Sequence, residues 1–283
     1  MAHTQRQDTG SVTLTDEQTD SSVVIAPHRG AIVTSFCVKA CELLYLDAAT
    51  FDDPAKNVRG GIPVLFPSPG KLDDDKFRSH GREGTLKQHG FARTLPWTVA
   101  AEPTSSTATL ALESSAATLS HYPWRFRSEL EFALNASCLR ITARVQNTDD
   151  APMPFGLGFH PYFRVVDKAK ARIDTDASLA FNNVSKKTHL FSGFDLTESE
   201  VDLHLLDHRN PSTLLHLGDG STIDLRASPE FALRVVWTLA GKDFVCLEPW
   251  TSPANSLNNG DRLLTLAPGQ TRELWIEIEF TKP

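Results

Sequence analysis

Several features common in other protein classes are scarce or missing in this sequence. No apolar run approaches the ~18 residues of a membrane-spanning helix, and the polar start, Met1 to Asp8, lacks the apolar core of a signal peptide. Lys and Arg form no cluster, and the formal net charge of the 283-residue chain is -7. Nucleic acid and other polyanions are therefore not expected partners. We expect a soluble, cytoplasmic protein that binds neither nucleic acid nor membrane.

Cysteine is also scarce, and its placement argues against disulfides and zinc sites. The four cysteines lie in strand-like apolar runs without CxxC spacing, which is typical of free thiols in a reducing compartment. They are Cys37, Cys41, Cys138 and Cys246. What the chain does have is 40% hydrophobic and 22% charged residues, a balance that predicts a folded protein with a sizeable core.

Helical periodicity is nearly absent, and the regular parts of the chain alternate with period two. Residues 126–134 and 139–146 alternate apolar and polar side chains around the turn signal Asn135-Ala136-Ser137, which predicts a β-hairpin. A second hairpin is predicted at residues 214–217 and 222–225, because Asp219-Gly220 suits a tight turn. Further strands are expected at 23–26, 31–38, 42–46, 97–101, 108–112, 233–239, 244–247 and 273–280.

Many short strands without intervening helices predict an all-β fold, a large antiparallel sandwich. The sequence contains no internal repeat and no linker rich in Pro, Gly or Ser. We therefore expect a polar N-terminal segment at residues 1–20 and a single β-sandwich domain at residues 21–283.

Two segments interrupt the strand rhythm. Residues 67–87 are charged and long enough to suggest a rim or lid over a site. Residues 195–207 are rich in acids, and a solvated connection is the simpler interpretation.

One histidine and one glutamate are candidate acid and base groups. His160 precedes Pro161, which restricts its backbone to extended conformations, and a histidine is a ready proton donor near neutral pH. Glu248 ends an apolar strand, where burial would raise the pKa of its carboxyl group. The alternatives are a hydrogen-bonded core histidine and a glutamate paired with an arginine such as Arg59 or Arg93. If both act on one substrate, they form a general acid and base pair.

A third group of candidates surrounds two glycine-containing stretches, Arg59-Gly60-Gly61-Ile62-Pro63 and Gln88-His89-Gly90-Phe91-Ala92-Arg93. We expect these glycines to let the backbone approach a ligand, and guanidinium groups suit carboxylate, phosphate or sugar hydroxyls. The alternative is a bulge at the glycines with Arg59 in a surface ion pair. His204 and His208 have the spacing of a metal-binding pair on a helix, but their surroundings predict a strand, so we predict no metal site.

At these positions the chain resembles the aldose 1-epimerases, or galactose mutarotase-like enzymes, particularly the branch of the hexose-6-phosphate 1-epimerases. The resemblance rests on the two glycine-containing stretches, on His160-Pro161-Tyr162-Phe163 and on Glu248-Pro249-Trp250, in the family's order. It implies a β-supersandwich with the sugar site on a concave face. The implied chemistry needs no cofactor, and we expect a monomer.

Carried over residue by residue, the resemblance makes His160 the acid that protonates the ring oxygen of a pyranose. Glu248 becomes the base that takes the proton of the anomeric hydroxyl, so the ring opens and recloses on the other face. The resemblance also implies that His89, Gln88 and Asp202 bind the sugar, although Leu203 follows Asp202 where the family commonly has arginine.

The nature of the substrate stays open between a free and a 6-phosphorylated aldohexose. Arg59 and Arg93 match the phosphate-binding positions of the phosphosugar branch, and a guanidinium suits phosphate. The segment from Pro67 to Phe77 departs from that branch: Lys71 would attract a phosphate and the acids at 73–75 would repel it. One alternative function is a non-catalytic carbohydrate-binding protein with the same site. Another is a polysaccharide lyase or glycoside hydrolase, which usually needs a longer chain.

Overall fold

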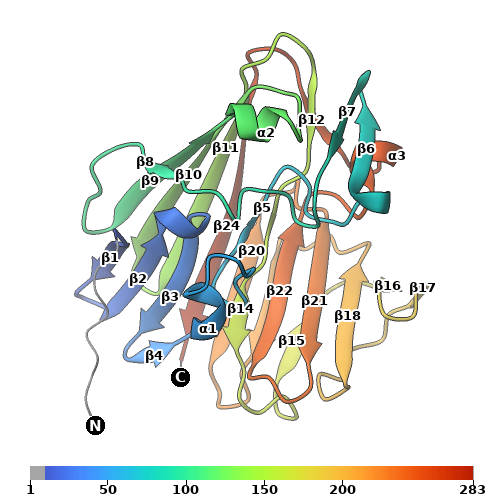
Figure 1. The fold of residues 1–283 in the computed structure, drawn as a ribbon. Helices are drawn as coiled ribbons and strands as arrows, with labels where there is room; N and C mark the ends of the chain where they lie inside the picture. Colours follow the sequence, from blue (N-terminus) through green and yellow to red (C-terminus); the bar gives the residue numbers. More distant parts are fainter. Residues whose placement is uncertain (1–9, 283) are drawn as a thin grey trace.

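Antiparallel strands make up most of the molecule in the computed structural model, which describes residues 10–282 (Figure 1). The helices are single turns: α1 (Ala48–Phe51), α2 (Ala116–Leu119) and α3 (Ser256–Asn259), with 3-10 turns η1 (Pro27–Arg29) and η2 (Asp73–Asp75). None of the helices in this part of the chain is long and apolar enough to cross a membrane. The predicted all-β antiparallel class is confirmed, and the polar stretch Met1 to Asp8 lies outside the described residues.

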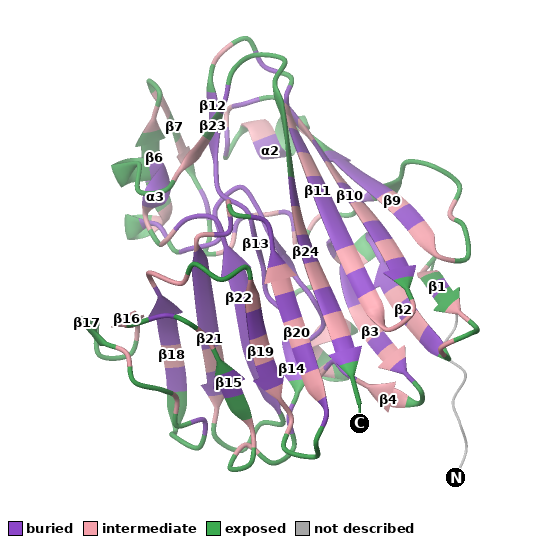
Figure 2. Ribbon diagram, turned by 180° about the vertical axis from the view of Figure 1, so that it is seen from behind, coloured by how far each residue is buried: buried purple, intermediate pink, exposed green. Residues whose placement is uncertain are grey.

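One eight-stranded sheet forms the back of the molecule (Figure 2). Its order is β15 (Arg172–Asp174), β19 (Ser212–His216), β20 (Thr222–Ala227), β24 (Thr271–Thr281), β11 (Cys138–Asn147), β10 (Phe126–Asn135), β9 (Thr107–Glu113) and β8 (Thr98–Val99). Both predicted hairpins are found here, as β10 with β11 and β19 with β20. Their turns contain Ala136, Gly218 and Gly220 at positive φ, as tight turns require.

A second eight-stranded sheet lies in front of the first and carries the site described below. Its path is β17 (Lys187–Leu190), β16 (Leu179–Asn182), β18 (Glu200–Leu205), β21 (Leu233–Leu239), β22 (Phe244–Trp250), β13 (Gly158–Phe159) and β5 (Val64–Leu65), with β14 (Tyr162–Arg164) also paired to β22. Every residue of β22 is buried, since one face meets the core and the other is covered by side chains of the site.

Smaller sheets complete the fold. A four-stranded sheet consists of β1 (Val12–Asp16), β2 (Ser21–Ala26), β3 (Ile32–Val38) and β4 (Cys41–Glu42), and two pairs are β12 (Met153–Phe155) with β23 (Leu264–Leu266) and β6 (Lys76–Ser79) with β7 (Arg82–Thr85). The strand expected at 42–46 is shorter, because the chain leaves β3 after Glu42 and bridges Phe163 and Gly60 through Leu44 and Leu46. Strand β1 pairs with β2, although it lies in the segment 1–20 expected to precede the domain.

Alternation along the strands builds the core between the sheets. In β10, buried residues alternate with partly exposed ones from Phe126 to Leu134, and the partly exposed positions carry charges such as Glu129 and Glu131. A cluster of aromatic rings continues this core toward the site. Phe91 stacks on Phe126 with ring centroids 5.9 Å apart, and Phe66 meets Phe126 at 5.1 Å. Because Phe91 lies between His89 and Arg93, this packing fixes the segment that carries both.

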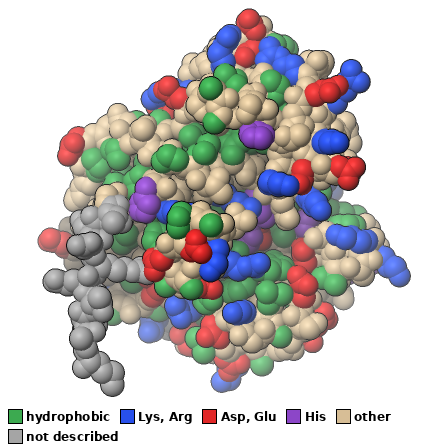
Figure 3. All heavy atoms as spheres, viewed as in Figure 1, with side chains coloured by type: hydrophobic (Ala, Val, Ile, Leu, Met, Phe, Trp, Pro, Cys, Tyr) green, Lys and Arg blue, Asp and Glu red, His purple; other side chains and the backbone are tan. Residues whose placement is uncertain are grey.

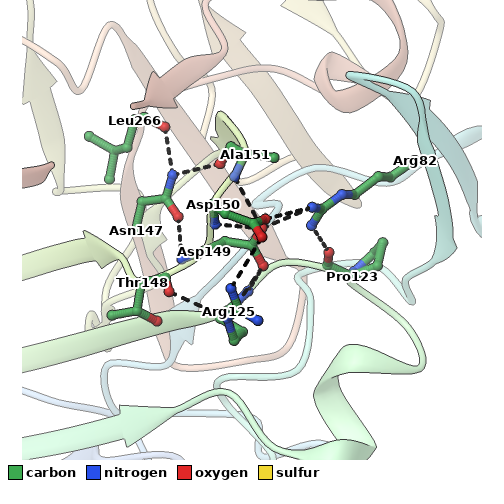
Figure 4. A network of polar contacts seen from close by, with 9 residues as sticks. All are labelled: Arg82, Pro123, Arg125, Asn147, Thr148, Asp149, Asp150, Ala151 and Leu266. Carbon is green, nitrogen blue, oxygen red and sulfur yellow. Dashed lines mark hydrogen bonds and ion pairs between the residues drawn. The ribbon is translucent and has the colours of Figure 1, made fainter. Parts of the chain in front are cut away.

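The segment 67–87 contains an anchored hairpin, from Lys76 to Thr85. Arg82 of β7 donates from Nη2 to Asp149 Oδ1 at 2.9 Å, and Asp149 Oδ2 accepts from the Arg125 amide at 2.9 Å (Figure 4). On the other side, Asn258 of α3 accepts from the Arg78 amide at 2.9 Å. These bonds tie β6 and β7 to the β11–β12 connection and to α3.

Candidate active site

A cavity of about 430 Å³ opens on the exposed face of the front sheet, over β18, β21 and β22. Figure 3 shows histidine side chains inside a hollow of this face, with Lys, Arg, Asp and Glu side chains around it. All seven residues predicted as catalytic or substrate-binding line the cavity: Arg59, Gln88, His89, Arg93, His160, Asp202 and Glu248. The remaining lining residues are Asn57, Val58, Gly70, Lys71, Tyr162, Asn183, Glu200, His204, Val235, Trp237, Trp250 and Ala254.

The register of the front sheet explains why distant residues meet. Asp202 of β18 pairs with Trp237 of β21, Trp237 with Cys246 of β22, and Cys246 with Tyr162 of β14. In the next row on the same face, Phe181, His204, Val235 and Glu248 are successive partners across β16, β18, β21 and β22. Because side chains of directly paired residues lie ~5 Å apart, these two rows form a continuous floor.

His160 and Glu248 face each other at the bottom of the cavity. His160 Nε2 lies 3.3 Å from Glu248 Oε1, and the two side chains are 9% and 2% exposed. The His160 ring stacks on Tyr162 with centroids 4.6 Å apart, and its backbone amide donates to Pro63 O at 3.0 Å. Trp250 Nε1 donates to the second oxygen of Glu248 at 3.1 Å. The pair is therefore oriented by neighbours that are themselves part of the sheet.

Burial shifts the pKa values of Glu248 and His160 in opposite directions. It raises the pKa of Glu248 well above its ordinary value, and the nearby Asp202 carboxylate adds to that effect. Burial also lowers the pKa of His160 well below its ordinary value, as do the neighbouring His89 and Arg93. These shifts favour the neutral form of the pair, in which Glu248 carries the proton and the His160 ring is uncharged; transfer of that proton to His160, 3.3 Å away, gives the charged form.

His89 is held as a neutral ring in one orientation. Its Nδ1 lies 2.5 Å from Pro69 O, which can only accept, so Nδ1 carries the hydrogen and Nε2 is left as an acceptor. Burial, followed by the charge of Arg93, lowers the pKa of His89 to about 3. The ring meets those of His160 and Trp250 edge-on at 5.6 and 5.8 Å. It can therefore accept a hydrogen bond from a ligand hydroxyl.

Two guanidinium groups approach the cavity from loops. Arg59 is exposed, and its guanidinium lies 5.5 Å from the centre of the Trp237 ring. Arg93 donates to Gln88 O at 3.0 Å, while its buried Nε has no partner among the described residues. Burial lowers the pKa of Arg93, and the positive charge of Arg59 lowers it further although Tyr162 opposes this. An anionic group bound between the arginines would relieve this repulsion.

The glycines beside these arginines lie close to the chain's own backbone. A Cβ atom on Gly60 would lie 2.5 Å from Tyr45 O, one on Gly61 2.3 Å from Val33 O, and one on Gly90 2.2 Å from Phe66 O. All three also have positive φ. These glycines therefore permit close approach to the chain's own backbone, and the expectation that they also let the backbone approach a ligand stays a prediction.

Asp202 is part of the front sheet, which corrects the interpretation of residues 195–207 as a solvated connection. Strand β18 covers Glu200 to Leu205, and only the residues before it form a turn. Asp202 Oδ2 accepts from Asn183 Nδ2 at 2.7 Å, and Oδ1 lies 3.3 Å from His204 Nε2. Burial raises the pKa of Asp202, but these contacts outweigh it and hold the pKa below its ordinary value.

Some lining residues were missed by sequence reasoning. Period-two alternation from Asp202 would have placed His204 on the same face, and Trp250 belongs to the Glu248 motif. Asn183 and Trp237 carry no local signal, because strand pairing alone brings them to the cavity. Lys71 lines the cavity, whereas the acids at 73–75 do not.

Cys246 lies beside the acid and base pair. Ligand atoms of His160, Cys246 and Glu248 are all within 4.8 Å of one another, and these are donor types that zinc accepts. Burial raises the pKa of the Cys246 thiol well above its ordinary value, followed by the effect of Glu248, so loss of its proton would be costly. The absence of a metal requirement stays a prediction.

The chain is similar to known proteins over most of its length. The family model described as aldose 1-epimerase matches residues 11–279. A protein from Cenchrus ciliaris with the provisional name glucose-6-phosphate 1-epimerase is 26% identical over 256 residues, covering 81% of this chain and 72% of the relative. The crystal structure of the Slr1438 protein from Synechocystis sp. PCC 6803 is 36% identical, with a TM-score of 0.93 and 96% of each chain covered. A galactose mutarotase-like protein from Lactobacillus casei, 22% identical, shares the fold with a TM-score of 0.78, over 96% of this chain and 100% of its own.

Proposed function

Because the chain belongs to the aldose 1-epimerase family, we propose that it interconverts the α and β anomers of an aldohexose or hexose 6-phosphate, using His160 and Glu248 as the proton-transfer pair. The observation that carries this proposal is their direct contact at 3.3 Å in the floor of a cavity lined by hydroxyl-binding groups. A general acid and a general base within reach of one small substrate is the arrangement that a hemiacetal needs in order to open.

The geometry suggests how the reaction proceeds. His160, in its protonated form, gives a proton to the ring oxygen while Glu248, in its ionised form, takes the proton of the anomeric hydroxyl. The C1–O5 bond breaks to give the aldehyde, rotation about C1–C2 exposes its other face, and closure returns both protons. The pair therefore ends each turnover with the one proton it began with. Trp250 stabilises the ionised Glu248 by its hydrogen bond at 3.1 Å.

Neighbouring side chains position the sugar for these transfers. His89 accepts from one hydroxyl at Nε2, and the ionised Asp202 accepts from another. Arg59, Arg93 and Lys71 supply positive charge from loops, which supports a substrate with an anionic group at the end remote from C1. A 6-phosphate has that placement.

The test follows the optical rotation of freshly dissolved α-glucose with and without protein, and repeats it with His160→Asn and Glu248→Gln. We expect each variant to lose nearly all acceleration, since a positioned acid or base contributes about 10²–10⁴-fold. Circular dichroism checks that both remain folded. Full activity in either variant would refute the proposal, whereas sugar binding without acceleration in the wild type would favour a carbohydrate-binding protein.

The phosphate is tested by comparing the anomerisation rates of glucose and glucose 6-phosphate. If the arginines bind the phosphate, Arg59→Ala and Arg93→Ala lower kcat/KM for the phosphosugar and leave that for glucose nearly unchanged. Equal losses on both sugars would exclude the phosphate role.

A further inference from the structure

His204 lies in the row of the sheet that also contains Glu248, yet the mechanism gives it no role. It belongs to β18, follows Asp202 by two positions and therefore projects from the same face. His204 is only 7% exposed, and it lines the cavity. Val235 separates it from Glu248 along the row. A buried imidazole in this place has two groups of the site within reach.

The first contact is with the carboxylate of Asp202. His204 Nε2 lies 3.3 Å from Oδ1, while Oδ2 accepts from Asn183 Nδ2 at 2.7 Å. Asn183 is itself fixed, because its Oδ1 accepts from Lys186 Nζ at 2.7 Å. Asn183 and His204 thus contact both oxygens of Asp202, which restricts rotation of the carboxylate.

The second contact is with the indole that holds the base. The His204 ring meets the Trp250 ring edge-on with centroids 5.3 Å apart, and Phe181 packs edge-on against His204 at 5.8 Å. Trp250 donates to Glu248 Oε2 at 3.1 Å. The imidazole therefore limits how far the indole can move, and through it the direction of the hydrogen bond to Glu248.

We propose that His204 is a positioning residue with two separable effects: its Nε2–H fixes Asp202 for substrate binding, and its ring fixes Trp250 and thereby Glu248. The inference rests on the proposed epimerase function for its kinetic consequences. The contacts with Asp202 and Trp250 do not depend on that function.

Two substitutions separate the effects. His204→Phe keeps an aromatic ring against Trp250 and removes the donor, so we expect a rise in KM of about tenfold, the value of one hydrogen bond to a charged group, with kcat nearly unchanged. His204→Gln keeps a donor near Asp202 and removes the ring, so we expect kcat to fall several-fold. We also expect the pH dependence of kcat to shift, with KM changing less.

If His204 had only a structural role, its variants would lose stability, and KM and kcat would not change to different extents. His208→Phe is the matched control, because His208 lies four residues on and outside the lining of the cavity, and it should leave both constants unchanged. Thermal unfolding of all three variants accompanies the kinetics. Unchanged kinetics in both His204 variants, or equal changes in KM and kcat for both, would overturn the inference.

A direct measurement tests the first effect without any enzyme assay. Carbon NMR follows the titration of the Asp202 carboxyl group in the wild type and in His204→Phe. The other titratable groups that interact with this carboxylate are Glu248, Lys186, His89 and Cys246, and none of them is changed. We expect the pKa of Asp202 to rise in the variant, and an unchanged pKa would overturn the inference. An inactive wild type would instead refute the proposed function.

Discussion

Replacing Glu248 by glutamine should abolish activity and at the same time change how stability depends on pH. The amide has the shape of the carboxylate, and its oxygen can still accept from Trp250 Nε1. What disappears is a titratable group that is 2% exposed and whose pKa burial raises well above its ordinary value near 4.5. The native wild type therefore binds a proton that the unfolded chain releases.

The sign and size of the effect follow from proton linkage. Because the native state holds more protons than the unfolded state, wild-type stability falls with rising pH, from the unfolded pKa of Glu248 up to its native pKa. The slope is about 1.4 kcal/mol per pH unit in that window. Glu248→Gln lacks this contribution, so its stability relative to the wild type should increase by about 3 kcal/mol over two pH units within the window.

Urea unfolding followed by tryptophan fluorescence, repeated at a series of pH values, measures this difference. His160→Asn is the opposite control, since burial lowers the pKa of His160 and makes wild-type stability rise with pH up to the ordinary value of 6.5. The two difference curves should therefore slope in opposite directions. A difference between Glu248→Gln and the wild type that does not vary with pH would refute the reasoning.

Three further predictions concern the reaction, the metal and the fold. The rate of anomer exchange should be highest over a plateau of pH. It should fall on the acid side, where the His160–Glu248 pair gains a second proton, and on the alkaline side, where the pair loses its single proton. A rate that only rises with pH would contradict a pair that works with one proton. Dialysis against a chelator should leave the rate unchanged, because each step is a proton transfer; a loss restored by zinc would show that the donors at Cys246 bind a working metal. Asp149→Ala should destabilise the protein by about 2–4 kcal/mol, because a side chain that is only 6% exposed loses its bonds to Arg82 and to the Arg125 amide. Urea unfolding measures the loss, with Asp149→Asn as the milder variant. A loss of stability below ~1 kcal/mol would contradict the prediction.

The parts of the fold that sequence predicts well are those specified by neighbours in the chain. Alternation in residues 126–134 and 139–146 and the turn between them were enough to predict the β10–β11 hairpin, because register in a tight hairpin follows from the turn. The strand expected at 42–46 failed for the opposite reason. Its residues change partner from β3 to Phe163 and Gly60, and such a change depends on chain far away in the sequence.

The same distinction applies to the site. His160 and Glu248 could be proposed because prolines and aromatic residues adjoin them in the chain. Trp237 could not, since it reaches the cavity only through pairing of β21 with β18 and β22. The contacts of Gly60 and Gly61 could not be predicted either, because the carbonyl groups that they approach, those of Tyr45 and Val33, belong to other parts of the chain.

The side chains proposed to act at the two ends of a substrate lie on different kinds of element, strands for one end and loops for the other. Glu248 and Asp202 belong to strands β22 and β18, which both pair with β21, and His160 lies between β13 and β14 of the same sheet. Arg59 and Arg93, by contrast, lie on loops. Groups on a hydrogen-bonded sheet keep their distances within narrow limits, as proton transfer over about 3 Å demands, whereas an ionic contact tolerates more movement. Changes at the arginines should therefore act mainly on the choice of substrate. Because the charge of Arg93 also lowers the pKa of His160, Arg93→Ala should in addition raise that pKa, whereas loss of the Asp202 carboxylate should lower the pKa of Glu248.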